Sequence, residues 1–223
     1  MDTAEHVIRI EVVDAVAGRG EIVGDLRLPT QARGLVIFAH GSGSSRHSPR
    51  NRMVATSLIR AGFATLLFDL LTAAEERVDD RTRQLRFDIR LLAERLLAAV
   101  DAVVERPATS GLPLGTFGAS TGAAAALVAA AARPAEVRAI VSRGGRPDLA
   151  GDSLPGVRAP TLLIVGSLDP QVIGLNHEAA ARMTCVQETV IVPGATHLFE
   201  EPGTLEAVAR LAVDWFDRSL HEP

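Results

Sequence analysis

The stretch Leu114-Gly115-Thr116-Phe117-Gly118-Ala119-Ser120-Thr121-Gly122 contains the pattern Gly-x-Ser-x-Gly directly after a short apolar run. The segment that follows, residues 121–132, is rich in alanine, the best helix former. The pattern therefore predicts a strand, a sharp turn and a helix, with Ser120 on the turn, where a general base can reach its hydroxyl. The alternative is a glycine-flanked turn in which Ser120 only caps the helix.

Apolar runs and amphipathic segments alternate on both sides of this stretch. Strand-like runs stand at residues 35–39, 64–68, 114–117, 137–141, 162–165 and 189–192. Helical spacing is found at about 50–60, about 81–104, 121–132, 175–183 and 204–218. Residues 7–13 and 21–28 alternate polar and apolar side chains around two glycines. We expect one α/β domain over residues 1–223, with a mostly parallel sheet, an antiparallel N-terminal hairpin at one edge and helices on both faces.

The composition limits the classes of function. A chain of 223 residues with 47% hydrophobic content can bury a sizeable core. The net charge of -4 gives no basic excess for nucleic acid, and the absence of lysine removes Schiff-base chemistry. Cys185 is the only cysteine, which excludes an internal disulfide and a multi-cysteine metal site. No secretory or membrane-spanning pattern is found, so we expect a cytoplasmic protein without nucleic-acid or membrane partners, and we leave the oligomeric state open.

Two later strand ends carry the partners that an activated serine needs. Asp169 follows the apolar run 162–165 and precedes Pro170, and His197 follows the run 189–192 in a glycine-bearing loop. We expect His197 to accept the Ser120 proton and Asp169 to hold the other imidazole nitrogen. The alternatives are a turn-capping Asp169 and a structural His197. Three other candidates fit this order less well: Asp148, Asp152 and His177.

The loop after the run 35–39 reads His40-Gly41-Ser42-Gly43-Ser44-Ser45. At this place we expect the Ser42 amide to bind a developing oxyanion together with the Thr121 amide, which opens the helix after the serine. The other interpretation is a flexible polar connection.

Hydrogen-bond donors continue along the chain in Arg46-His47-Ser48-Pro49-Arg50-Asn51. These residues could bind an anionic group of a substrate, or could form a solvated loop in which Ser48 and Pro49 begin the next helix. Arg143 and Arg146, after another strand, could contribute. The candidate substrate contacts are Gly43, Arg46, His47, Arg50 and Arg143.

With these residues placed, the chain resembles the dienelactone-hydrolase-like branch of the α/β-hydrolases over nearly its full length. The similarity rests on residues 40–47, 118–122, 142–147, Asp169 and 193–199. It implies an α/β-hydrolase fold without a large cap, hydrolysis of an ester or lactone through an acyl-enzyme, and no metal or organic cofactor. Dienelactone hydrolases use a cysteine nucleophile where this chain has Ser120, and Cys185, at the end of a predicted helix, cannot replace it.

The expected function is therefore a serine hydrolase that cleaves small ester or lactone substrates. Only about 20 residues separate the runs that end at 141 and begin at 161, which leaves no room for a large cap there. Residues 70–80 are acidic and are expected to form a polar surface loop. Two other functions remain open: an acyltransferase or perhydrolase of haloperoxidase type, and a catalytically silent binder of small molecules.

Overall fold

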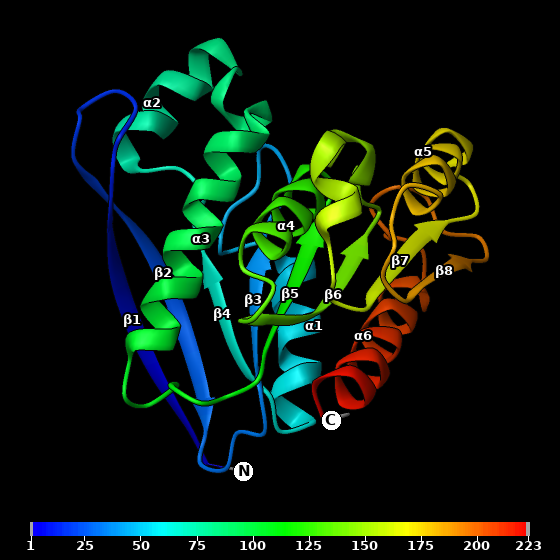
Figure 1. The fold of residues 1–223 in the computed structure, drawn as a ribbon, viewed down its shortest axis with the longest axis horizontal. Coiled ribbons are helices and arrows are strands. Elements are labelled where there is room, and N and C mark those ends of the chain that lie inside the picture. Colours follow the sequence, from blue (N-terminus) through cyan, green and yellow to red (C-terminus); the bar gives the residue numbers. More distant parts are fainter. Residues whose placement is uncertain (1, 222–223) are drawn as a thin grey trace.

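The structure, a computed structural model, describes residues 2–221 as a layered arrangement of strands and helices (Figure 1). Hydrogen bonding and backbone angles define the following elements: β1 (Thr3–Val12), β2 (Gly20–Pro29), β3 (Leu35–Ala39), α1 (Pro49–Arg60), β4 (Ala64–Phe68), α2 (Ala73–Thr82), η1 (Leu85–Phe87), α3 (Ile89–Glu105), β5 (Leu114–Ala119), α4 (Thr121–Ala132), β6 (Val137–Arg143), η2 (Pro147–Gly156), β7 (Thr161–Gly166), α5 (Pro170–Ala180), β8 (Gln187–Val192) and α6 (Thr204–His221). Strands and helices alternate from β3 onward, as the sequence pattern predicts.

The strands form one eight-stranded sheet in the order β1-β2-β4-β3-β5-β6-β7-β8. β2 pairs antiparallel with both β1 and β4, whereas the pairings among β4, β3, β5, β6, β7 and β8 are parallel. The expected mostly parallel sheet with an antiparallel pair at one edge is confirmed. The carboxyl ends of the parallel strands point upward in Figure 1, and the loops that follow them gather at that edge, where sheets of this type bind ligands.

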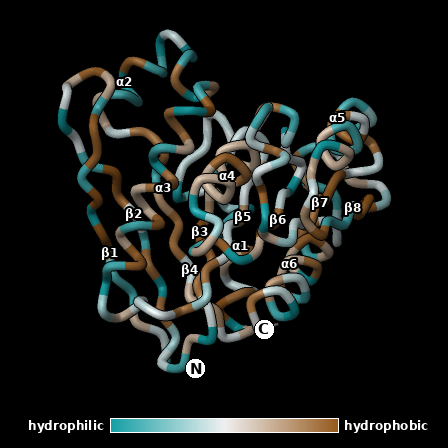
Figure 2. The backbone as a smooth tube through the Cα atoms, in the orientation of Figure 1, coloured by the Kyte–Doolittle hydropathy of each residue, from teal (hydrophilic) through white to brown (hydrophobic). Residues whose placement is uncertain are grey.

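Both faces of the sheet are covered by helices. Successive side chains of a strand point to opposite sides, so each strand contributes to the core on both faces. In β3, Leu35 and Ile37 enter one hydrophobic core, and Val36 and Phe38 enter the other. Helices α3 and α4 cover the first face, and α1 and α6 cover the second (Figure 1). The hydropathy colouring agrees with this layering, with brown segments along the strands, for example in β7 and β8 (Figure 2).

Two expectations for the chain between β4 and β5 are wrong. Residues 70–80, expected as a surface loop, lead into α2, and residues 81–104, expected as one helix, are divided among α2, η1 and α3. The division has local causes: Arg83 ends α2 in the left-handed conformation, with φ 56°, and the Asp88 carboxylate accepts a hydrogen bond from the Leu91 amide at the start of α3.

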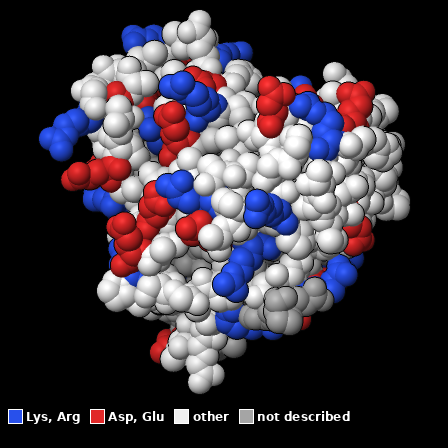
Figure 3. Space-filling view, viewed as in Figure 1, with Lys and Arg blue, Asp and Glu red and all other residues white. Residues whose placement is uncertain are grey.

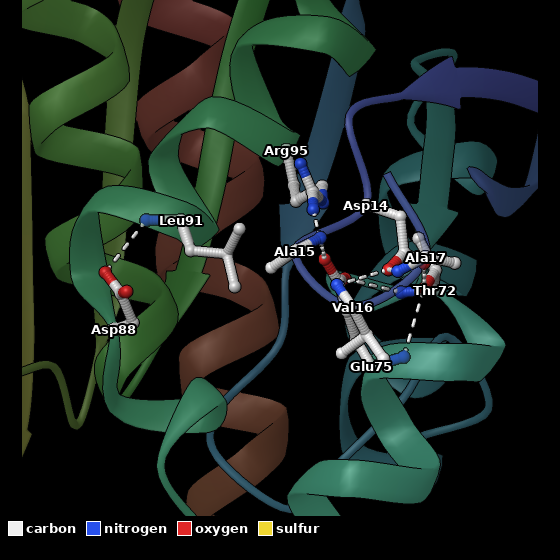
Figure 4. A network of polar contacts seen from close by, with 9 residues as sticks. All are labelled: Asp14, Ala15, Val16, Ala17, Thr72, Glu75, Asp88, Leu91 and Arg95. Atoms are coloured by element: carbon white, nitrogen blue, oxygen red, sulfur yellow. Dashed lines mark hydrogen bonds and ion pairs between the residues drawn. The ribbon is translucent and has the colours of Figure 1, made fainter. Parts of the chain in front are cut away.

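A buried polar network explains why α2 is a helix rather than a solvated loop (Figure 4). The Glu75 side chain is 0% exposed, and its carboxylate accepts hydrogen bonds from the Arg95 guanidinium of α3, the Ala15 amide of the hairpin turn and the Thr72 amide. The Thr72 hydroxyl in turn donates to the Asp14 carboxylate. This network therefore fastens the start of α2 to both the hairpin and α3.

Charged side chains of both signs intermingle on the face shown in Figure 3. No helix within the described residues is long and apolar enough to cross a membrane.

Candidate active site

Ser120 stands at the sharp turn between β5 and α4. Its backbone angles are φ 50° and ψ −119°, in the left-handed half of conformational space that side chains other than glycine rarely adopt. Its side chain makes no capping hydrogen bond to α4. The structure therefore does not support the alternative in which Ser120 serves only as a helix cap, and the strained turn is the geometry that exposes a nucleophile.

The two glycines of the pentapeptide are required by close backbone contacts. A methyl group added to Gly118 would lie 2.4 Å from the Ala123 Cα atom, and one added to Gly122 would lie 2.2 Å from the Ala39 carbonyl oxygen. Real side chains do not come this close to backbone atoms. The first turn of α4 therefore lies directly against the end of β3, which brings the Ser120 turn and the loop after β3 together.

Asp169 and His197 are joined as the sequence order predicts. The Asp169 Oδ2 atom lies 2.7 Å from the His197 Nδ1 atom, and their side chains are 16% and 38% exposed. The carboxylate accepts in this contact, so Nδ1 is the donor and Nε2 takes no part in it. Asp169 immediately precedes α5, which begins at Pro170 rather than at the expected residue 175.

The loops that carry these two residues touch each other. A methyl group on Gly166, the last residue of β7, would lie 2.3 Å from the Ala195 carbonyl oxygen, and the Leu168 amide donates to that same oxygen at 2.9 Å. The absence of a side chain at Gly166 thus lets the loop after β8 pack onto the end of β7. This contact sets the separation of Asp169 and His197.

Gly144, just after β6, connects this pair to the Ser120 turn. A methyl group on Gly144 would lie 2.9 Å from the His197 carbonyl oxygen and 3.6 Å from its Nδ1 atom. The residue before it, Arg143, accepts a hydrogen bond through its carbonyl oxygen from the Ser120 amide at 3.3 Å. The ends of β5, β6, β7 and β8 therefore bring Ser120, His197 and Asp169 into one region.

The loop after β3 lies next to the nucleophile. A methyl group on Gly41 would lie 3.2 Å from the Ser120 Cβ atom. His40 anchors this loop, because its Nε2 atom accepts a hydrogen bond from the Leu70 amide at 3.1 Å and its Nδ1 atom lies 2.9 Å from the Gly41 carbonyl oxygen. Burial lowers the His40 pKa, so the ring is neutral and donates through Nδ1. The expected oxyanion donor Ser42 is on this loop.

A cavity of about 370 Å³ opens beside the same loop. Residues 40–45 and 47–49 form one side, residues 69–71 and Leu92 another, and α2 with Arg86 closes it. Arg86, which the sequence did not single out, is held by the buried Asp79 carboxylate at 2.5 Å, and its Nη1 atom would lie 3.1 Å from a methyl group on Gly43. Gly43 and His47 line the cavity, and their role as substrate contacts stays a prediction.

The arginines expected to contact substrate lie in two different settings. Arg46 is engaged elsewhere, since its guanidinium pairs with the Asp69 and Asp25 carboxylates. Its donors are therefore used to hold the loop against the sheet, and the expectation that they bind substrate is not supported by the geometry. Arg50 and Arg143 instead lie close enough for the charge of one to affect the pKa of the other.

The competing acid and base candidates lie in other settings. Asp148 forms a two-point ion pair with Arg146, and Asp152 pairs with Arg182 at 3.2 Å. His177 is exposed on α5. Burial raises the pKa of the Cys185 thiol, which makes the reactive thiolate scarce.

The fold and the grouped side chains place the chain in the α/β-hydrolase class. Within that class, it belongs to the dienelactone hydrolase family, whose model matches residues 22–220. A solved structure of dienelactone hydrolase from Anabaena variabilis is 55% identical, with a TM-score of 0.94, and the match covers 99% of this chain and 100% of that one. Est1E from Butyrivibrio proteoclasticus has a TM-score of 0.78 at 16% identity over 97% of this chain and 99% of its own, a likeness of fold alone. The family and the 55% identical structure support a hydrolase.

Curated relatives from two strains of Mycobacterium tuberculosis are 60% identical over 220 residues, which is 99% of this chain and 49% of each relative. Both carry the provisional name of a phosphoribosyl transferase. The chain thus spans about half the length of the curated relatives it matches.

Proposed function

We propose that this chain is a serine hydrolase that cleaves small ester or lactone substrates through an acyl-enzyme. The observation that carries the proposal is Ser120 on a strained turn, with φ 50° and ψ −119°, close to a His197–Asp169 pair that is 2.7 Å apart. A serine hydroxyl is a weak nucleophile, and a histidine oriented by a carboxylate is the arrangement that activates it.

In the proposed reaction, the Ser120 hydroxyl attacks the carbonyl carbon while His197 Nε2 accepts its proton. Asp169 holds the Nδ1 proton and stabilises the imidazolium that forms. The negative charge that develops on the carbonyl oxygen is bound by the amides of Ser42 and Thr121, the latter at the N-terminus of α4.

The intermediate then collapses: the bond from carbon to the leaving alcohol breaks, and His197 returns the proton to that alcohol. A water molecule next attacks the acyl carbon and gives a proton to His197. The bond from carbon to Ser120 Oγ then breaks, His197 returns the proton to Oγ, and the acid leaves. The 370 Å³ cavity next to Gly41 is of a size for small substrates.

The test is covalent labelling and burst kinetics. A fluorophosphonate should label Ser120, 4-nitrophenyl acetate should give a burst of nitrophenol, and Ser120→Ala should lose both. Ser110→Ala, an exposed serine at the opposite end of β5, is the matched control and should keep both. Folded wild-type protein that is not labelled at Ser120 would refute the proposal.

The acceptor of the acyl group separates hydrolysis from its alternatives. If alcohols or hydrogen peroxide outcompete water for the acyl-enzyme at millimolar concentration, the chain is an acyltransferase or perhydrolase. The name of the Mycobacterium tuberculosis relatives belongs to proteins of which this chain matches 49%, and our proposal concerns the matched half.

A further inference from the structure

Arg143 is a buried cation without a counter-ion. It ends β6, is 7% exposed, and its Nε and Nη1 atoms are buried without any hydrogen-bond partner. No carboxylate of the described residues forms an ion pair with it. Its backbone carbonyl accepts from the Ser120 amide at 3.3 Å, so this cation stands in the strand beside the proposed nucleophile.

The Arg143 side chain points toward the α1 side of the sheet. Ser142, the preceding residue, points to the α4 side, since a methyl group on Gly145 would lie 1.9 Å from the Ser142 Oγ atom and 2.6 Å from the Ala123 Cβ atom. Side chains alternate along a strand, so Arg143 faces the other way. On that side the first turn of α1 carries Arg50, whose charge is near enough to lower the Arg143 pKa.

Arg50 adds a second positive charge at the same place. Its Nη1 atom donates to the Glu200 carboxylate at 2.9 Å, but its Nε atom is buried and has no partner. Glu200 follows His197 by three residues and its side chain is 62% exposed, so it compensates one guanidinium only in part. The N-terminus of α1 adds the positive end of a helix dipole.

Two guanidinium groups with one exposed carboxylate are an unfavourable arrangement in a protein interior. Burial, together with the charge of Arg50, lowers the Arg143 pKa to about 10. Buried donors without partners and buried charges without counter-ions are uncommon because they are costly, and they are retained where a ligand completes them.

We propose that Arg143 and Arg50 form a subsite for an anionic group of the substrate, a carboxylate or a phosphate, next to Ser120. The inference rests on the proposed function, because it assigns the substrate of the same site. Guanidinium groups match both anions, and a bound anion would fill the donors that Arg143 leaves open.

Binding is tested without catalysis in the Ser120→Ala protein, so that a failure of the hydrolase proposal does not obscure the result. Calorimetry with benzoate and with inorganic phosphate should detect binding of at least one anion. Arg143→Met should weaken that binding about ten- to a hundredfold, the loss of a charge-assisted hydrogen bond. Arg138→Gln, an exposed arginine of the same strand, is the matched control. No binding of either anion, or equal binding with and without Arg143, would overturn the proposal.

Kinetics with matched esters then locate the anion on the substrate. A comparison of mono-4-nitrophenyl glutarate with 4-nitrophenyl pentanoate tests an anion on the acyl side of the ester. A comparison of 4-acetoxybenzoate or 4-acetoxyphenyl phosphate with phenyl acetate tests an anion on the leaving group. For at least one pair, Arg143→Met should reduce the preference in kcat/KM for the anionic ester about ten- to a hundredfold, and Arg143→Lys should reduce it less. If every pair loses equally in both variants, the role of Arg143 is structural and the proposal fails.

The melting temperature of the variant is an independent test, and it also reveals whether the variant has a folding defect. Removal of an unpaired buried charge does not destabilise a protein, so Arg143→Met should keep or raise the melting temperature. A large fall would mean that Arg143 also supports the fold, and anion binding by a second variant then decides: binding in Arg50→Gln equal to that with Arg50 present would overturn the proposal. Should Arg143→Met not fold, Arg50→Gln provides the binding comparison, because Arg50 is partly exposed.

Discussion

Replacing Glu75 by alanine removes the carboxylate at the centre of the network in Figure 4. The Arg95 side chain, 3% exposed, would lose its counter-ion, and the amides of Ala15 and Thr72 would lose their acceptor. Breaking a buried ion pair by removing one partner costs about 3–5 kcal/mol. We expect Glu75→Ala to lower the free energy of unfolding by this amount, which in a chain of this size lowers Tm by roughly 10 °C.

The assay is urea unfolding followed by the fluorescence of Trp215, the only tryptophan, which is buried on α6. The control is Glu94→Ala, which removes an exposed i,i+4 pair with Arg90 on the same helix as Arg95 and should change stability by less than about 0.5 kcal/mol. A loss below about 1 kcal/mol for Glu75→Ala would refute the reasoning, since it would mean that the ion pair and both amides are replaced by water without penalty.

Three further predictions concern the candidate site. Asp169→Asn should keep the fold but lower kcat by about three to four orders of magnitude with little change in KM, because His197 loses the partner that selects its tautomer. Steady-state kinetics on 4-nitrophenyl acetate will measure both constants. Gly122→Ala should lower the free energy of unfolding, measured in urea, by about 1–3 kcal/mol, because its methyl group would lie 2.2 Å from the Ala39 carbonyl oxygen. The control is Gly174→Ala in α5, which has open space around it and should be neutral or stabilising. Similar losses in both variants would contradict the contact at Gly122. Because the folded-state pKa of His40 is lowered, its contribution to stability is fully present above the unfolded pKa of about 6.5 and is lost as the pH falls below it. The urea concentration at the midpoint of unfolding should therefore fall less between pH 8 and pH 5 in His40→Asn than in the wild type.

The sequence was sufficient to predict a mostly parallel sheet with an antiparallel pair at one edge, and the places of three candidate site residues at the ends of its strands. Strand-like runs mark β3 to β8, and Ser120, Asp169 and His197 each follow one of these runs, so a parallel sheet brings them to one edge. The pairing of Asp169 with His197 follows from this order. The single domain expected over residues 1–223 stays a prediction.

The helix α2 could not be predicted because its stability comes from distant partners. Residues such as Glu75 and Asp79 look like solvated acids in the sequence, but both side chains are buried against arginines of later segments. The same holds for Arg143, which is buried at the end of β6, and for Arg86, which is bound to Asp79 and lies next to Gly43. Charge pairing across the fold is not visible in local patterns.

The anchors of α2 lie apart from the loops that carry the candidate site. Its anchors, Asp14 in the hairpin turn and Arg95 in α3, lie outside the loops that carry Ser120 and His197, yet α2 forms a wall of the cavity. Substitutions in the hairpin turn or along α2 would therefore act on the shape of this cavity without lying in the loops that carry Ser120 and His197.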